Sequence, residues 1–463
     1  MKPTYLHDTI AAISTPVGKG AIAIVRLSGD KAFSIASKVF SRPDKILNSP
    51  VSHTLHYGKI INPQNSVVMD EVLLALMTPD KSFTGEPIVE IHCHGGEQLP
   101  HSILKLLLTQ GARMADPGEF TRRSFLNGKI DLTQAEAIHD IIVSQNIVSS
   151  SIAVSSLEKR FSKVIYGFRQ DLINILAEIE VSVDYPEEDL EPVQNQKALS
   201  ALSRIQSEID QILKDSLDGR ILKRGVKVAI VGKTNAGKSS LFNYLTREDR
   251  AIVSHIHGTT RDYLETHINL QDLPVELVDT AGFRKTGDHI ESIGKDRSKS
   301  KIAEADYTLW IIDQSGDWDE HDLEILSHID SKKTILVFNK ADLKESLNKD
   351  EIIKKLSPRA YFSISLLSGT GLREFETGLR SEILGADFTY NDQAIICNIR
   401  QESLLSLSKS SIQKAYEALK SNMSYEFIAI DLRDSLDFLG EIVGEVTTED
   451  ILNQIFDNFC VGK

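Results

Sequence analysis

The stretch that most constrains the fold of this chain is VAIVGKTNAGKSSLFNYL, residues 228–245, in which an apolar strand, a glycine-containing loop and an apolar helix follow one another. Gly232 and Gly237 allow the backbone amides of such a loop to curl round a β-phosphate, and the helix points its positive N-terminus at the same group. Lys238 is expected to reach the β- and γ-phosphates, and the Ser239 hydroxyl to hold Mg²⁺. The stretch therefore predicts a nucleotide-binding α/β domain with a parallel sheet.

The segment TILVFNKAD, residues 334–342, favours guanine as the base of that nucleotide, because it places Asn339, Lys340 and Asp342 after another apolar strand. The Asp342 carboxylate can accept hydrogen bonds from N1–H and the amino group of guanine. Adenine offers an acceptor at N1 and would leave that carboxylate unpaired. Together with VELVDTAG between these two segments, the order of motifs resembles a small GTPase and predicts GTP.

Composition limits the classes of partner and location. The chain has 463 residues and a formal net charge of −14, which argues against a protein that wraps nucleic acid by broad charge neutralisation. The three cysteines, Cys93, Cys397 and Cys460, are too few and too scattered for a disulfide framework, so a reducing compartment is expected. The N-terminal residues lack the apolar core of a signal peptide, and no apolar run approaches the length of a membrane helix. We expect a cytoplasmic protein with no membrane partner.

Changes in the pattern of apolar residues along the chain predict three domains. Short alternating strands and helices fill the first part, which we bound at 1–121 as an α+β domain. Long helical stripes occupy 122–221 and 385–463, and the α/β pattern of the nucleotide domain lies between them at 222–384. We favour insertion of the nucleotide domain into one helical domain over three consecutive domains, because neither helical half is expected to form a domain by itself.

Two local patterns leave alternatives open. The last residues, FCVGK (459–463), follow TTEDILNQIFDNF (447–459), whose apolar residues form a helical stripe from about Thr448 to Phe459. The tail is therefore either a frayed chain end or the end of a docked helix. The triplet His92-Cys93-His94 suggests a zinc site, but on a strand the two histidines share one face and the cysteine lies on the other, which favours packed strand residues.

Several motifs outside the nucleotide domain make the resemblance specific. DTIAAISTPVGKGAIAIVRLSG (8–29), SFTGEPIVEIHCHGG (82–96), DPGEFTRRSFLNGKIDLTQAEAI (116–138), SHIHGTTRD (254–262) and the terminal FCVGK resemble those of the MnmE (TrmE) family of tRNA-modifying GTPases. The resemblance covers nearly the whole chain. It implies an N-terminal folate-binding and dimerisation domain, a helical domain and an inserted Ras-like GTPase domain.

The resemblance also implies a reaction. With the flavoprotein MnmG (GidA), which carries FAD, the family adds a carboxymethylaminomethyl or aminomethyl group at C5 of the wobble uridine of certain tRNAs. The one-carbon unit comes from 5-formyl-tetrahydrofolate or a related tetrahydrofolate, and the family forms a homodimer. The alternative is a GTP-dependent ribosome-assembly or switch protein without one-carbon chemistry, but the RNA-binding module and basic tails usual in such proteins are not visible in the sequence.

In the GTPase domain the resemblance assigns residues to two cations and to catalysis. Phe283 follows the DTAG segment where Ras-like enzymes have a glutamine that orients the attacking water, and the family uses Glu291 instead. The expected K⁺ ligands are Asn235, Ser254, Ile256 and Thr259, and the expected Mg²⁺ ligands are Ser239 and Thr260. The expected GTP-binding residues are these ligands with Ala236, Gly237, Lys238, Ser240, Asp279, Thr280, Ala281, Gly282, Asn339, Lys340, Asp342 and Ser365.

The resemblance assigns the folate site to Arg26, Glu86, Lys129 and Lys463. A carboxylate such as Glu86 could pair the N–H and amino edge of a pterin, and the lysines could meet the glutamate tail or the formyl oxygen. Cys460 is either a nucleophile or proton donor in one-carbon transfer or a small packing residue.

Overall fold

The computed structural model describes residues 8–16, 18–47, 50–144, 147–184, 192–246, 265–271, 273–279, 304–384 and 395–463. Contacts divide the chain into two compact units. One consists of Met1–Ile142, Val154–Gln206 and Ser403–Lys463, and the other of Val143–Ala153 and Ser207–Glu402. Each unit is described by itself.

The first unit begins with a mixed sheet whose strands lie in the order β3-β4-β5-β2-β1-β6. Its elements are β1 (Ile10–Ile13), β2 (Ile22–Ser28), α1 (Ala32–Val39), α2 (Asp44–Leu47), β3 (Thr54–Ile61), β4 (Val68–Met77), β5 (Ile88–His94), α3 (Gln98–Thr109) and β6 (Arg113–Met114). The short alternating strands and helices expected in this part of the chain are present.

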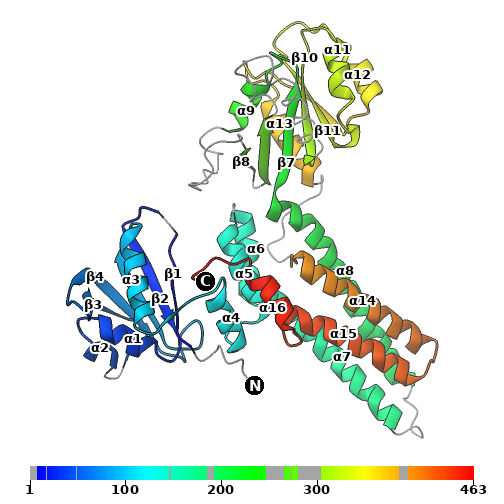
Figure 1. Cartoon of the computed structure of the whole chain (residues 1–463). Helices are drawn as coiled ribbons and strands as arrows, with labels where there is room; N and C mark the ends of the chain where they lie inside the picture. The colour runs from blue at the N-terminus through cyan, green and yellow to red at the C-terminus, as the bar shows by residue number, and fades with distance from the viewer. Residues whose placement is uncertain are drawn as a thin grey trace. The chain divides into compact units, whose positions relative to one another are not determined.

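Side-chain alternation decides which face of this sheet is covered. Inward residues such as Val25, Leu74 and Ile91 are fully buried and form one core with residues of α1 and α3. Those helices lie across the sheet in Figure 1. On the opposite face, Ile22 is 65% exposed and Tyr57 is 52% exposed, so much of that face lacks a covering layer within the described residues.

The first unit continues as a bundle of long helices taken from both ends of the chain (Figure 1). Wholly within it are α4 (Glu119–Leu126), α7 (Arg160–Asp184), α15 (Tyr425–Val443) and α16 (Glu449–Phe456). It also takes α5 (Leu132–Val143) up to Ile142, α6 (Ile147–Leu157) from Val154, α8 (Pro192–Arg224) up to Gln206 and α14 (Ile399–Lys420) from Ser403, and the rest of these four helices belongs to the second unit. Arg169 of α7 donates to the Leu436 carbonyl of α15 at 2.6 Å. Because helices before and after the nucleotide domain pack together, the expected insertion is confirmed.

The second unit contains a sheet with the order β12-β11-β10-β7-β9-β8, parallel except for β8. Its elements are β7 (Val226–Gly232), α9 (Lys238–Leu245), β8 (Glu265–Leu270), β9 (Leu273–Asp279), β10 (Tyr307–Asp313), α11 (Glu320–Leu326), the 3₁₀ turn η2 (Ser331–Lys333), β11 (Thr334–Asn339), α12 (Lys349–Leu356), β12 (Ala360–Ser363) and α13 (Leu372–Leu384). The parallel α/β prediction is confirmed.

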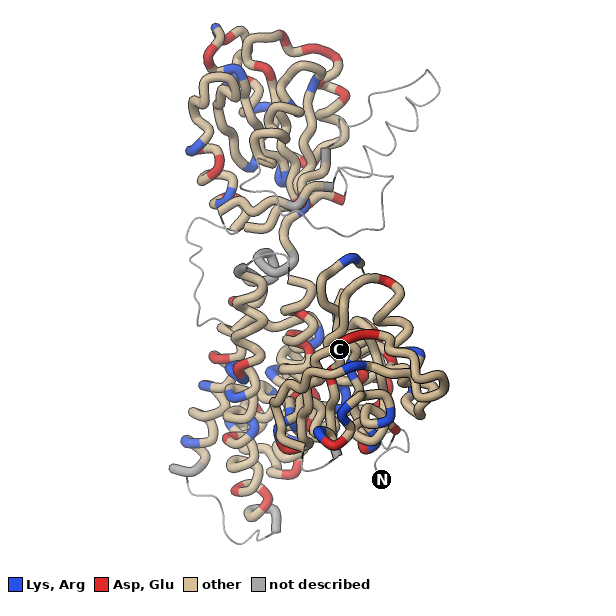
Figure 2. The backbone as a smooth tube through the Cα atoms, turned by 90° about the vertical axis from the view of Figure 1, so that its left-hand side faces the viewer, with Lys and Arg blue, Asp and Glu red and all other residues tan. Residues whose placement is uncertain are grey.

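In the view of Figure 2, acidic and basic residues are interspersed along the helices of the bundle. Among the described residues, no helix is long and apolar enough to cross a membrane.

Candidate functional site

The loop after β7 has the backbone geometry of a phosphate cradle. Gly232 and Gly237 have φ values of 149° and 108°, which glycine adopts readily, and Asn235 between them is left-handed at 65°. A Cβ on Gly232 would lie 2.3 Å from the Ile311 carbonyl oxygen, so a side chain there would collide with backbone. Lys238 Nζ donates to the Gly232 carbonyl at 2.6 Å, which holds this amine inside the loop.

The predicted contact residues differ in accessibility. Asn235, Ser239 and Ser240 are exposed at the loop and the first turn of α9, whereas Ala236 is buried. Exposed hydroxyl and amide groups beside a helix N-terminus can meet a phosphate or its cation. The cradle and its side chains thus fit a nucleoside triphosphate.

The NKAD segment packs directly on the phosphate loop. Asn339 is 4% exposed at the end of β11, and its Nδ2 donates to the Ala236 carbonyl at 2.9 Å. Its Oδ1 accepts from the Leu366 amide at 3.3 Å. This asparagine therefore joins the phosphate loop to the loop after β12, which would border the base.

Asp342 and Lys340 are each fixed by a neighbour. The buried Ser365 donates its hydroxyl to Asp342 Oδ1 at 2.5 Å, while the Ser365 amide bonds to Thr370. Lys340 Nζ donates to Asp313 Oδ2 at 2.5 Å. Burial alone would raise the pKa of Asp313, but hydrogen bonds from Lys340 and Ser315 outweigh it and lower that pKa.

Part of the predicted GTP site falls outside the described residues. This holds for Ser254, Ile256, Thr259, Thr260, Thr280, Ala281, Gly282 and Glu291. Asp279 is the last residue of β9, and its backbone lies opposite Ile230 of the neighbouring β7, two residues before Gly232 of the phosphate loop.

The sequence reasoning missed a clamp on the phosphate loop. Lys233 Nζ reaches away from the loop to Asp319 Oδ2 at 3.0 Å and also pairs with Asp322, which is 2% exposed. These two carboxylates form the capping box of α11. The one local sign of this clamp was Lys233 itself, next to the first glycine of the loop. Its partners lie more than eighty residues away in the sequence; Lys233 and the Asp317 carbonyl, to which it also donates, are 84 positions apart.

A second candidate site lies in the first unit, where the C-terminal tail meets the N-terminal sheet. Val461 pairs with Pro117 in an antiparallel bridge, and the Gly462 carbonyl accepts from Ser14 Oγ at 3.1 Å and from Arg26 Nη1 at 3.4 Å. The Phe120 amide donates to the Lys463 carbonyl at 3.2 Å. The docked alternative for the tail is confirmed, although α16 itself ends at Phe456, three residues before the expected end.

Hydrophobic packing holds the tail from the helical side. Phe459 is 6% exposed, and its ring lies 4.9 Å from that of His139 and 5.3 Å from that of Phe456. Cys460, the next residue, is exposed. The aromatic anchor thus presents this thiol at the surface beside the tail's contact with the sheet.

Arg26 is partnered on the outer face of β2. Its guanidinium pairs with Glu90 of β5 at 2.7 Å and lies over the Phe120 ring at 5.6 Å. The neighbouring His92 lies with Nε2 3.3 Å from Glu90 Oε2, which accepts the hydrogen bond. This arrangement explains how a charged residue persists in an otherwise apolar strand.

Glu86 lies next to the same strand, and Lys129 lies next to Gly85, the residue before Glu86. Ser28 Oγ, two residues beyond Arg26 on the same face of β2, donates to Glu86 Oε2 at 2.7 Å. Lys129 Cε lies 3.6 Å from the place a Cβ on Gly85 would occupy, and Lys129 Nζ donates to the Asp80 carbonyl at 2.8 Å. The structure thus brings Arg26, Glu86, Lys129 and the backbone of Lys463 to one region of the first unit.

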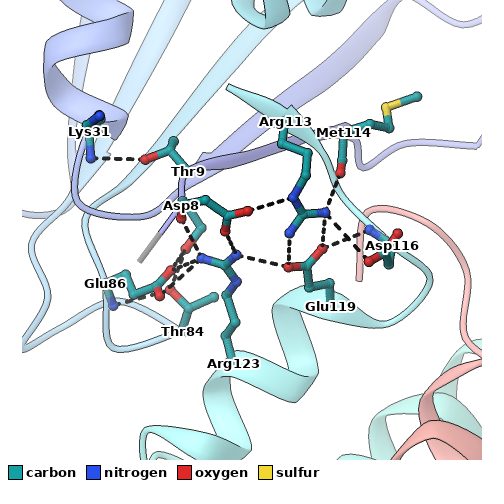
Figure 3. Close-up of polar contacts among 11 residues, drawn as sticks. Asp8, Thr9, Lys31, Thr84, Glu86, Arg113, Met114, Asp116, Glu119 and Arg123 are labelled. Carbon is teal, nitrogen blue, oxygen red and sulfur yellow. Dashed lines mark hydrogen bonds and ion pairs between the residues drawn. The ribbon is translucent and has the colours of Figure 1, made fainter. Parts of the chain in front are cut away.

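An ion cluster centred on the buried Arg123 supports this region and was not found from the sequence. It consists of Asp8, Glu86, Arg113, Glu119 and Arg123, which we call the Arg123 cluster (Figure 3). Burial alone would raise the pKa of Asp8, but the hydrogen bonds from Arg113 and Arg123 outweigh it, so the pKa of Asp8 is lowered. The pKa of Glu119 is lowered by the same competition.

The His92-Cys93-His94 triplet alternates as a strand should. His94 is exposed and bonds to Asp70 at 2.7 Å, while Cys93 is 2% exposed on the core face. Burial raises the pKa of the Cys93 thiol to about 11. Within the described ranges, no group of three or more histidine, cysteine or acidic residues is placed to hold a metal ion.

A cavity of about 290 Å³ opens elsewhere on the N-terminal domain. Residues of the loop 13–20, of the start of β2 and of the turn before α3 line it, among them Lys19, Gly95 and His101. None of the four predicted folate residues lines it.

Comparison with known proteins identifies the domains. The family model described as the MnmE helical domain matches residues 132–460, and the model of the GTP-binding protein TrmE N-terminus matches residues 9–129. Among solved structures, that of Aquifex aeolicus Era bound to GDP and aluminium fluoride is 28% identical, covers 40% of this chain and 66% of its own, and has a TM-score of 0.28.

Curated relatives match from end to end. The tRNA modification GTPase MnmE of Acetivibrio thermocellus is 44% identical over 459 residues, which are 99% of this chain and 100% of the relative. That of Enterococcus faecalis is 41% identical over 461 residues, 99% of each. With a family model spanning more than half of the chain and such relatives along nearly all of it, the chain belongs to the MnmE family of tRNA modification GTPases.

Proposed function

We propose that this tRNA modification GTPase is activated by K⁺ and works with the flavoprotein MnmG. Together they would add a carboxymethylaminomethyl or aminomethyl group at C5 of the wobble uridine of certain tRNAs in the cytoplasm. The one-carbon unit would come from 5-formyl-tetrahydrofolate or a related folate bound to this chain, and the FAD would be carried by MnmG. The observation that carries the folate part is the gathering of Arg26, Glu86, Lys129 and the tail in one region.

The residues of that region suit the parts of a folate. A pterin presents N–H donors that a carboxylate such as Glu86 can accept, and its conjugated tail ends in carboxylates that Lys129 and Lys463 can pair. Arg26 contacts both Glu90 and the tail carbonyl of Gly462. When bound, the folate would supply the one-carbon unit near the exposed Cys460, which acts either in the transfer or in packing.

Reconstitution tests the folate and partner assignments. The full chain, MnmG, a substrate tRNA, GTP, 5-formyl-tetrahydrofolate, glycine or ammonium as the amine source and a reductant for the FAD of MnmG are expected to yield modified uridine, and omission of any one component is expected to abolish it. Calorimetry should show 5-formyl-tetrahydrofolate binding to this chain alone. Full modification without any folate would overturn the proposal. A Cys460→Ser variant that retains full modification would assign the thiol to packing.

The K⁺ assignment rests on the phosphate loop. Asn235 is exposed in the left-handed conformation between the two loop glycines, where its side-chain oxygen would help to hold K⁺ beside the phosphates. Ser254, Ile256 and Thr259 are proposed as further ligands, with Ser239 and Thr260 on Mg²⁺. A monovalent cation there would offset the charge that develops during phosphoryl transfer, and Glu291 would orient the attacking water.

Hydrolysis rates in two salts test this assignment. We expect GTP hydrolysis to be faster in K⁺ than in Na⁺, and Asn235→Ala to erase that difference. Equal rates of the unaltered protein in both salts would reject it. Glu291→Ala is expected to lower kcat by about two orders of magnitude with GTP affinity preserved.

A homodimer is proposed through the uncovered face of the N-terminal sheet. Tyr57 of β3 stands opposite Leu73 of β4, and Leu73 stands opposite His92 of β5, which itself neighbours Ile24 of β2. Leu73 is 43% exposed in this row. This row is apolar except for His92, and such a row crossing a sheet suits a second copy of the same surface.

A further inference from the structure

We infer that Arg123, acting with Ser28, is the positioning residue that orients the Glu86 carboxylate toward the amino edge of a bound pterin. The inference rests on the proposed folate function and assigns to it a residue that touches no ligand. Neither Arg123 nor Ser28 belongs to the predicted folate set.

Arg123 contacts Glu86 from the protein interior. It lies in α4 and is 1% exposed, and its Nη1 donates to Glu86 Oε1 at 3.2 Å and to Oε2 at 3.3 Å. The same nitrogen donates to the backbone carbonyl of Asp8 at 2.8 Å. One arginine nitrogen therefore joins the loop bearing Glu86 to the start of the N-terminal sheet.

The other side of the guanidinium is locked. Nη2 donates to Asp8 Oδ1 at 2.5 Å and to Glu119 Oε1 at 2.9 Å. Glu119 is held in turn by Arg113 at 2.6 Å and by the Asp116 amide at 2.8 Å (Figure 3). Because a planar guanidinium with both nitrogens engaged cannot swing, the direction of its contact with Glu86 is set by the fold.

Ser28 fixes the second oxygen of the carboxylate. Its single hydroxyl proton goes to Glu86 Oε2 at 2.7 Å, so in the 2.7 Å contact between Ser28 and Thr84 the threonine must donate. Thr84 Oγ1 also accepts from the Glu86 amide at 3.2 Å. The side chain of Glu86 is 11% exposed, so these contacts leave part of the carboxylate accessible.

The charge of the cluster suits a donor edge. Among the described residues of the cluster, two guanidinium groups face three carboxylates, Asp8, Glu86 and Glu119, so the positive charge does not cancel the negative. A site that keeps negative charge at an oriented carboxylate attracts N–H donors and repels anions. The pterin amino edge is such a donor group, whereas the glutamate tail of a folate is not.

The test measures discrimination between two ligands and uses the full chain. Calorimetry gives the Kd of 5-formyl-tetrahydrofolate and of an analogue in which methyl replaces the pterin 2-amino group. An oriented Glu86 favours the amino ligand over the methyl analogue. The Glu86→Gln variant is the reference in which that preference is expected to be lost completely. We expect Arg123→Met to reduce the preference by at least about ten-fold, mainly by weakening the amino ligand.

Arg113→Met is the matched control. Arg113 belongs to the same cluster and bonds Asp8 and Glu119, but no described contact joins it to Glu86. It should lower thermal stability while keeping the ratio of the two Kd values within about two-fold of the unaltered protein. GTP hydrolysis, measured on each preparation, verifies that the nucleotide domain is folded.

The outcomes separate the inference from the function beneath it. Equal weakening of both ligands by Arg123→Met would overturn the inference, because it would reduce Arg123 to general support of the fold. If Arg123→Met does not fold, Ser28→Ala replaces it, and an unchanged ratio in that variant would overturn the inference. If the unaltered protein binds neither ligand, the folate function itself fails and the inference fails with it.

Discussion

Arg123 carries its charge almost entirely out of solvent, and its neighbours make that position tolerable. Asp8, Glu86 and Glu119 each contact its guanidinium, so burial is offset by several charge-assisted hydrogen bonds. Burial alone would lower the pKa of Arg123, but these carboxylates outweigh it and raise that pKa. Removing one partner of such a buried pair typically costs about 3–5 kcal/mol, because the other charge is left uncompensated.

Glu119 gives this cluster a pH dependence. Its folded-state pKa is lowered from 4.5, since hydrogen bonds from Arg113 and Arg123 outweigh the effect of burial. The folded protein therefore binds fewer protons than the unfolded chain between the two pKa values. Its contribution is fully present above pH 4.5 and is lost as pH falls through the folded-state pKa. We expect Glu119→Gln to lower the thermal midpoint near neutral pH and to make it less sensitive to acid.

Thermal midpoints measured from neutral to acidic pH check this expectation. Asp30→Asn, at an exposed carboxylate of the same domain, is the control and should follow the unaltered protein. Parallel curves for Glu119→Gln and the unaltered protein would contradict the assignment.

At the scale of elements, Lys233 joins the end of β7 to the N-terminus of α11. The buried Asp322 relies on this lysine and on the Asp319 amide. Lys233→Met should destabilise the nucleotide domain by about 1–3 kcal/mol, because a buried acceptor loses a charged donor. Denaturant unfolding of Lys233→Met against Lys233→Arg, which keeps a donor, measures the effect. Equal stability of the two variants would show that the clamp contributes nothing.

The docked tail depends on Gly462. Its φ is 97°, and a Cβ there would lie 2.4 Å from the Ile13 carbonyl oxygen. Gly462→Ala should therefore weaken docking by about 2 kcal/mol, through hydrogen bonds worth roughly 1 kcal/mol each. Hydrogen exchange at the Phe120 amide, which donates to the Lys463 carbonyl, reports this directly.

A second glycine controls for the substitution itself. Gly167 of α7 has no atom within 4 Å of its added Cβ, so Gly167→Ala should leave exchange at Phe120 unchanged. If Gly462→Ala also leaves that exchange unchanged, the tail does not need the glycine.

Elements formed by local pattern were predictable, and contacts over long separations were not. The strand–loop–helix at Gly232 and the strands β2 to β5 follow from residues close together in the sequence. Arg123 is visible in the sequence as one of two adjacent arginines in DPGEFTRRSF. The residues around it do not indicate that it bonds to Asp8, which lies 115 positions away. The same limit hid the partners of Lys233.

At the scale of the whole molecule, the apolar row on the N-terminal sheet bears on assembly. Leu73→Lys would place a charge in the middle of that row and should convert a dimer to a monomer, because like charges would face each other across a two-fold axis. Light scattering gives the mass of each form. Phe427→Lys, at an apolar residue 58% exposed on α15, is the control and should remain dimeric. A dimeric Leu73→Lys variant would place the interface elsewhere.

The bond between Ser14 and Gly462 joins residues 448 positions apart, and this separation sets a time during synthesis. A ribosome adds roughly 5–20 residues per second, so the N-terminal sheet leaves the exit tunnel tens of seconds before its last neighbour exists. During that interval Arg26 lacks the Gly462 carbonyl and Phe120 lacks its acceptor. During synthesis the N-terminal domain therefore lacks these two hydrogen bonds, and a ligand that needs the docked tail can bind only after residues 462 and 463 have been added.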